Sequence, residues 1–105
     1  MEMTRATLIA VALSCFVVGG ADGNELFEDC QKGRGGNFSD GACAGYIVGA
    51  HDAYEGVGGF CVPAEANAGQ IIDVVKIYLR DHPEKRHLSG SRLILQALKE
   101  KVPCN

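Results

Sequence analysis

Five cysteines are the residues of this sequence most able to make covalent bonds. Cys15 lies in an apolar N-terminal run that is described below as a leader, and Cys30, Cys43, Cys61 and Cys104 follow it. No two of them are separated by the two to four residues usual in zinc-ligand pairs, and no C-x-x-C redox motif occurs. Removal of the leader takes Cys15 away and leaves four cysteines, an even number that is typical of a disulfide framework in an exported protein. The pattern predicts two structural disulfides and neither a metal site nor a redox site.

The three histidines, His51, His82 and His87, do not form a predicted catalytic or metal-binding group. His51 and Asp52 are adjacent on a predicted helix, where neighbouring side chains diverge by about 100°, so we expect no oriented dyad. Asp52 is expected to be a solvated or hydrogen-bonded acid that fixes the following loop. His82 and His87 flank a proline and form neither an HxH nor an HxxxH pair. We expect no bound metal.

A catalytic nucleophile is also not expected. The serines Ser39, Ser89 and Ser91 stand where helix caps are needed, and each of the four cysteines has a predicted disulfide partner. The formal net charge of −3 supplies no basic surface for nucleic acid. The sequence therefore predicts a protein that is not an enzyme, with no catalytic residues and no cofactor.

The N-terminus has the order of a secretory signal peptide. Arg5 precedes an apolar run over residues 6–18, and the small residues Gly19-Gly20-Ala21 follow. The run is shorter than the ~20 apolar residues of a membrane span. We predict a signal over 1–21, cleavage after Ala21, and a periplasmic domain over 22–105. A lipoprotein signal with Cys15 as the lipidated residue is the alternative, although the apolar run continues beyond Cys15.

Helical periodicity without strand-like alternation predicts an all-α domain of four to five helices. Asn24 is expected to cap a helix through Cys30. A second helix is expected from Ser39 or Asp40 to about Glu55, a third from the capping box of Asn67 and Gln70 to Asp81, and a fourth after Ser89 or Ser91. The second helix carries a stripe of small residues, Gly41, Gly45, Gly49 and Ala53. We expect another helix of the same chain to pack closely on it, with a homodimer contact as the alternative.

Disulfide pairing depends on helix packing. If consecutive helices are antiparallel, Cys30 lies near Cys43 and Cys61 near Cys104, which favours those two pairs. A nested arrangement, Cys43–Cys61 with Cys30–Cys104, stays open. Each bond would contribute roughly 2–4 kcal/mol to the stability of a domain with a modest core.

The segment between the third and fourth helices is short, stiffened by proline and dense in charges of both signs. It consists of Asp81, His82, Pro83, Glu84, Lys85, Arg86, His87 and Leu88. A loop held by flanking helices can present side chains to a protein partner at low entropic cost. An ordinary polar connection between helices explains the same residues, and both interpretations stand at this point.

An ordered set of motifs runs through the chain after residue 22. It comprises Gly23-Asn24-Glu25-Leu26 before Cys30, Cys43-Ala44-Gly45-Tyr46-Ile47-Val48-Gly49 with Asp52-Ala53, Phe60-Cys61-Val62-Pro63, Gln70 to Val75, Tyr78-Leu79, His82-Pro83-Glu84, Leu93, Ala97-Leu98 and Pro103-Cys104. In this order the chain resembles the Rap/Tai family of periplasmic immunity proteins of type VI secretion systems. It departs from that family at Val102, where an aromatic residue is usual, and in the glycine-rich loop over residues 32–37.

The resemblance implies a small helical protein, often dimeric, that binds and blocks a peptidoglycan amidase effector. In related complexes a protruding loop of the immunity protein enters the effector's cleft, a role that would fall here to Asp81–Leu88. The alternative function is a periplasmic helical stress or chaperone-like binding protein without a dedicated effector.

Overall fold

The computed structural model describes residues 20–32 and 38–105. Residues 1–19 of the predicted leader over 1–21, and residues 33–37 of the glycine-rich loop, lie outside them. The described residues form α2 (Gly23–Lys32), α3 (Phe38–Tyr54), α4 (Ala68–Asp81), the 3-10 helix η1 (Pro83–Lys85) and α5 (Gly90–Lys101). Extended pairing in these residues is limited to two isolated bridges. The predicted all-α class is confirmed. None of the helices described is long and apolar enough to cross a membrane.

Two of the predicted helix starts are confirmed by their side-chain hydrogen bonds. Asn67 Oδ1 accepts from the Gln70 amide at 2.9 Å, and Gln70 Oε1 accepts from the Asn67 amide at 2.9 Å, which completes a capping box. Ser89 Oγ accepts from the Arg92 amide at 3.3 Å. Ser89 is therefore the N-cap of α5, and Ser91 is its second residue.

The predicted cap of the first helix is wrong by two residues. The carboxylate of Asp22, not Asn24, accepts from the backbone N–H of Glu25, at 2.9 Å, and α2 begins at Gly23. The Asn24 amide instead donates to the carbonyl of Arg86 at 2.8 Å. Both residues can cap a helix, and the pairing of this segment with a distant part of the chain decides between them.

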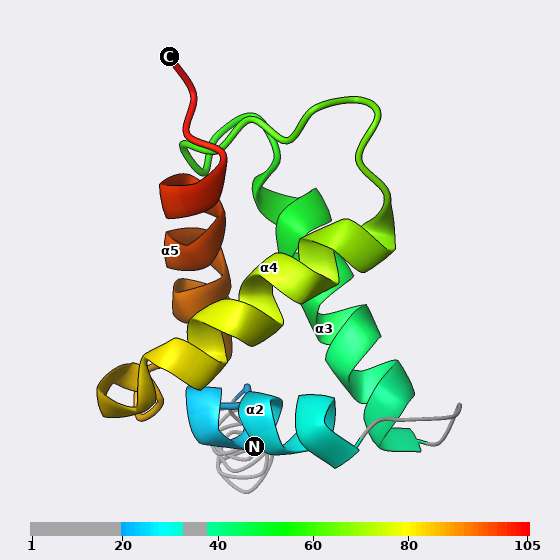
Figure 1. Cartoon of the computed structure of the whole chain (residues 1–105), viewed down its shortest axis with the longest axis vertical. Coiled ribbons are helices and arrows are strands. Elements are labelled where there is room, and N and C mark those ends of the chain that lie inside the picture. Colours follow the sequence, from blue (N-terminus) through cyan, green and yellow to red (C-terminus); the bar gives the residue numbers. More distant parts are fainter. Residues whose placement is uncertain (1–19, 33–37) are drawn as a thin grey trace, which may run out of the picture.

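The hydrophobic core lies between the four α-helices, with α4 crossing in front of α3 and α5 in Figure 1. Its largest fully buried side chains are Leu26, Ile47, Val75, Leu79, Leu93, Ile94 and Leu98. These seven residues come from all four α-helices, so each helix is fixed to the others by burial of one apolar face. The single buried polar residue among those described is His51.

Both disulfides of the favoured pairing are present, and the nested alternative is excluded. Cys30–Cys43 joins α2 to α3. Cys61–Cys104 fastens the segment after α3 to the C-terminus, where the Cys61 amide also donates to the Val102 carbonyl at 2.7 Å. The C-terminal segment therefore lies against the start of the α3–α4 connection (Figure 1).

The two disulfides differ in exposure, which predicts an order of reduction. Cys30 and Cys43 are each 4% exposed, whereas Cys61 and Cys104 are exposed. Because exchange requires a thiolate to reach sulfur, we expect dithiothreitol under native conditions to reduce Cys61–Cys104 first. Alkylation followed by peptide mass spectrometry would show the order. Equal labelling of all four cysteines throughout the time course would contradict it.

The small-residue stripe does not pack within the monomer, so that prediction is wrong. A Cβ atom built at Gly41, Gly45 or Gly49 would meet nothing within 4 Å, and Ala53 is exposed. The physical reason is the helical period. The core residues Cys43, Ile47 and His51 are offset from the stripe by two positions, or about 200° around the helix axis.

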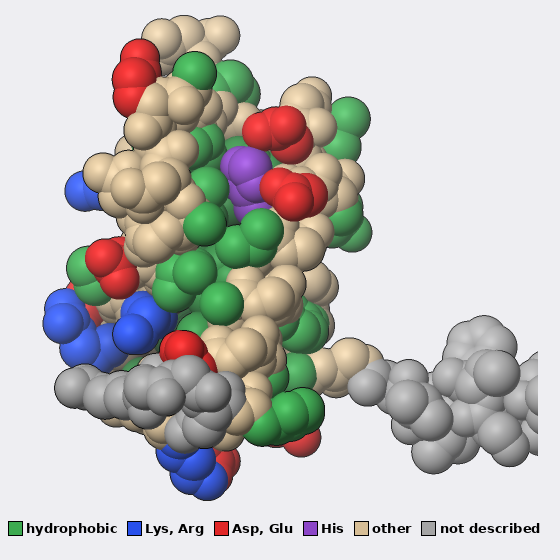
Figure 2. Space-filling model, turned by 90° about the vertical axis from the view of Figure 1, so that its right-hand side faces the viewer, with side chains coloured by type: hydrophobic (Ala, Val, Ile, Leu, Met, Phe, Trp, Pro, Cys, Tyr) green, Lys and Arg blue, Asp and Glu red, His purple; other side chains and the backbone are tan. Residues whose placement is uncertain are grey.

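The stripe therefore faces solvent, and the homodimer contact stays a prediction. Figure 2 views the molecule from the right-hand side of Figure 1, where α3 lies. Hydrophobic side chains run in a broken band down this face, and most of the Lys and Arg side chains in view lie toward its lower left.

Candidate partner-binding site

The connection between α4 and α5 projects from one side of the molecule (Figure 1). It carries the eight residues predicted to bind a partner, and the structure divides them into two sets. Asp81, Pro83, Glu84 and His87 are exposed, whereas His82, Lys85, Arg86 and Leu88 are partly buried. The first four are open to a partner. The contacts of the other four show what holds the loop in place.

Arg86 attaches the loop to two helices. Its Nε donates to the carbonyl of Leu79 at 2.7 Å and its Nη2 to the carbonyl of Arg80 at 3.0 Å. Its guanidinium carbon lies 3.6 Å from the centroid of the Phe27 ring on α2. Arg86 thus satisfies two carbonyls in the last turn of α4 and places a cation at the negative end of that helix. We assign it a structural role.

Tyr78, on α4, organises the first half of the loop. The His82 ring stacks on it with centroids 4.1 Å apart, and His82 Nδ1 lies 2.8 Å from the Tyr78 carbonyl oxygen. Lys85 Nζ donates to the Tyr78 hydroxyl at 3.3 Å, and this hydrogen bond is the main cause that raises the pKa of Lys85. The hydroxyl itself donates to Gln96 Oε1 on α5 at 3.2 Å. His82 and Lys85 are therefore engaged within the fold.

The second half of the loop is held by the N-terminal segment. The Gly23 amide donates to the carbonyl of Leu88 at 2.8 Å, and the Asn24 amide donates to that of Arg86 at 2.8 Å. A Cβ atom at Gly23 would lie 2.6 Å from the Arg86 carbonyl oxygen, so only glycine permits this approach. The loop is thus held by direct contacts with α2 and α4, and the Tyr78 hydroxyl links it to Gln96 of α5, before any partner binds.

The exposed set has a defined charge pattern. Arg80 donates to both carboxylate oxygens of Asp81, at 2.9 and 3.4 Å, and the hydrogen bond from Arg80 lowers the pKa of this carboxyl below its usual value. Glu84 and His87 extend from the turn itself, with Pro83 beside them. The tip therefore presents a carboxylate and an imidazole on a fixed backbone.

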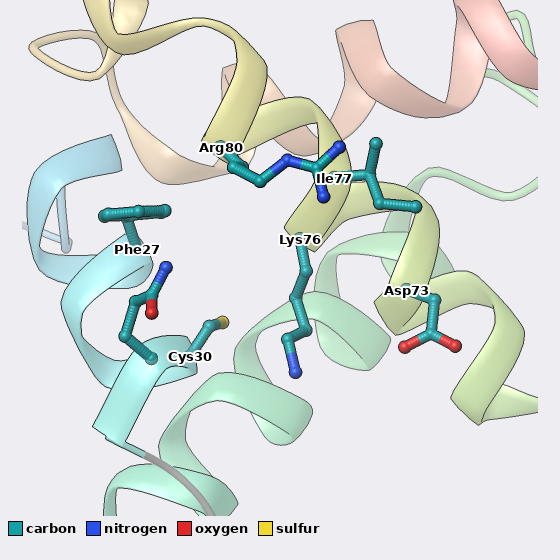
Figure 3. Close-up of a pocket in the computed structure, with 7 residues that line it drawn as sticks. Phe27, Cys30, Asp73, Lys76, Ile77 and Arg80 are labelled. Atoms are coloured by element: carbon teal, nitrogen blue, oxygen red, sulfur yellow. The ribbon is translucent and has the colours of Figure 1, made fainter.

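Two shallow hollows of about 300 Å³ each are lined in part by Ile77 of α4, which is 49% exposed. The first lies between α2 and α4. In Figure 3 the Phe27 and Cys30 side chains come from α2, and those of Asp73, Lys76, Ile77 and Arg80 come from α4. The second lies between α4 and α5 and includes Asp81 and His82, so it reaches the loop.

The contacts of His51 contradict the expectation that its side chain and that of Asp52 point in different directions. Its Nδ1 lies 2.9 Å from Asp52 Oδ1 and its Nε2 lies 3.6 Å from Glu55 Oε2, while its ring packs 5.5 Å from that of Phe60. The expectation failed because a flexible carboxylate can turn back along the helix surface toward its neighbour. Asp52 is exposed and hydrogen-bonded, as expected, but its hydrogen bond is made with the buried histidine and not with the following loop. No hydrogen bond reaches His51 Nε2.

No metal-binding cluster accompanies these side chains. Within residues 20–32 and 38–105, no group of three or more His, Cys, Asp or Glu residues could hold a metal ion. His82 is engaged with Tyr78, and His87 is exposed at the loop tip. The loop tip thus has the geometry of an exposed surface that a protein partner could contact.

The comparisons with known proteins identify the family of the chain. A family model, that of the Rap1a immunity proteins, matches residues 22–104. Among curated proteins, none matches the chain. Because the matched region contains η1, both disulfides and the four α-helices of the described residues, the chain belongs to the Rap1a immunity proteins, a non-enzymatic family whose members inhibit a cognate effector.

Proposed function

We propose that this chain is exported to the periplasm, where it binds a peptidoglycan amidase effector of type VI secretion and occludes its active site. The two disulfides and the family membership indicate an extracytoplasmic protein. The sequence of the first 21 residues supports export through a cleavable signal. Such a protein would protect the cell that makes it, or its siblings, from the effector.

The proposed mechanism rests on the finding that half of the predicted residues in the α4–α5 loop are exposed, while the other half are partly buried and contact the rest of the protein. The backbone of the loop is held in place by contacts of His82, Lys85, Arg86 and Leu88. The exposed residues therefore lose little conformational entropy when a partner binds. Inhibition would then be steric. The loop tip enters the effector's cleft and excludes substrate, and no covalent bond is made or broken.

An inhibition assay tests the proposal. The disulfide-bonded chain would be mixed with the amidase encoded beside its gene, and peptidoglycan hydrolysis would be followed by turbidity loss. We expect hydrolysis to stop once the chain reaches an equimolar amount, with a stable complex on size-exclusion chromatography. Full hydrolysis at a tenfold excess of the chain would overturn the proposal. Binding to many unfolded proteins in place of one folded partner would favour the chaperone-like alternative.

A further inference from the structure

The peptide carbonyl of Ala21 is built into the fold, although the sequence pattern alone places Ala21 at the end of the leader. Its oxygen accepts from the Gly90 amide at 2.9 Å, and the Tyr46 hydroxyl donates to it at 3.4 Å. The first of these bonds is half of the bridge between Asp22 and Ser89. A chain that begins at Asp22 has no atom in this position.

Gly90 gives independent evidence that the Ala21 carbonyl belongs to the folded domain. Gly90 is buried at the start of α5. A Cβ atom built there would lie 3.1 Å from the Ala21 oxygen and 3.1 Å from Cε1 of Tyr46. A side chain at position 90 would crowd both the Ala21 carbonyl and the Tyr46 ring, so glycine at this position allows both to pack there. If Ala21 is removed, the buried Gly90 amide loses its acceptor.

The charge of the new N-terminus also favours a mature chain that retains Ala21. Two helices begin at this point, α2 at Gly23 and α5 at Gly90. The N-terminus of a helix carries a partial positive charge, so a terminal ammonium group on Asp22 would lie next to two such ends. When Ala21 is retained, the Asp22 nitrogen is a neutral amide and the ammonium group moves one residue away.

We propose that processing leaves Ala21 on the mature chain, and that the bond cut is the one between Gly20 and Ala21. Hydrolysis adds water across this amide, leaving a carboxylate on Gly20 and an ammonium group on Ala21, with a leader peptidase as the catalyst. Gly20 supplies the small residue immediately before the cut and is itself exposed, and Val18 takes the position two residues earlier in the cleavage pattern. This inference rests on the proposed export.

The first test is the N-terminus of the exported protein. The full-length sequence would be expressed in a Gram-negative host, and the mature chain would be purified from the periplasm for intact mass and N-terminal sequencing. We expect a chain that retains Ala21, whose mass exceeds that of a chain starting at Asp22 by one alanine residue. A first residue of Asp22 or later would overturn the inference. An intact leader would overturn it together with the export proposal.

The second test does not depend on export. Three disulfide-bonded chains would be prepared by chemical synthesis, starting at Ala21, at Asp22, and at Asp22 with an acetylated amine. The acetyl carbonyl takes the place of the Ala21 carbonyl and removes the charge. We expect the free Asp22 form to melt about 4–8 °C below the Ala21 form and acetylation to restore most of the difference. Equal melting temperatures for the Ala21 and free Asp22 forms would overturn the structural argument, whatever the fate of the export proposal.

Discussion

Replacing Arg86 by alanine will lower the free energy of unfolding by about 3 kcal/mol, because hydrogen bonds from a charged donor and a cation–π contact are lost together. The substitution leaves the carbonyls of Leu79 and Arg80 without this donor and removes the cation from the Phe27 ring. For a domain of this size we expect the melting temperature to fall by more than about 10 °C. Thermal unfolding followed by circular dichroism would measure both quantities.

The control for this variant is Arg92→Ala, which removes the same side chain from an exposed position on α5. We expect it to change the melting temperature little, as exposed substitutions away from specific contacts usually do. Arg86→Lys should be intermediate, because an ammonium group keeps the charge and loses the paired geometry of the guanidinium. Equal stability of the Arg86→Ala and Arg92→Ala proteins would refute the structural role assigned to Arg86.

Replacing both ionisable side chains at the loop tip, Glu84→Lys with His87→Glu, will weaken effector binding by about 30-fold or more while leaving the fold stable. Loss of one partner from a buried charge pair costs about 2–5 kcal/mol, and each 1.4 kcal/mol is a factor of ten in affinity. Both side chains are exposed in the free protein, so their replacement should leave the melting temperature nearly unchanged. Isothermal titration with the effector would measure the affinity.

Glu65→Lys is the matched control, since Glu65 is exposed in the α3–α4 connection and away from the α4–α5 loop. It should bind the effector as the wild type does. Unchanged binding by the double variant would contradict the proposed loop, even if the wild-type chain inhibits the amidase. The test separates recognition from stability only because it leaves His82, Lys85, Arg86 and Leu88 in place. Deleting the whole loop would also remove the attachment of α2 and α4.

Family membership and the loop geometry answer different questions. The match over residues 22–104 implies a cognate effector as partner. The loop geometry supports a proposal about where that partner binds. A complex in which the effector contacts the exposed face of α3 in place of the loop would preserve the first conclusion and remove the second.

Local signals in the sequence were sufficient for much of the architecture. The capping box of Asn67 and Gln70 and the stop before Pro83 placed α4, because these contacts join residues only a few positions apart. The pairing Cys30–Cys43 followed from the expectation that successive helices lie side by side. The capping and the helix stop depend on neighbouring residues. The order of the helices favoured the observed pairing, and the structure excluded the nested alternative.

Tertiary structure alone decided the features that join distant parts of the chain. It made Asp22 the cap of α2, turned the Gly41 stripe toward solvent, and brought the Ala21 carbonyl to Gly90. Within the loop, it separated the exposed Glu84 from the anchored Arg86, two charged residues that the sequence does not distinguish. Side-chain type and periodicity specify which groups can make a contact. Which groups do make it depends on the segments that folding places beside them.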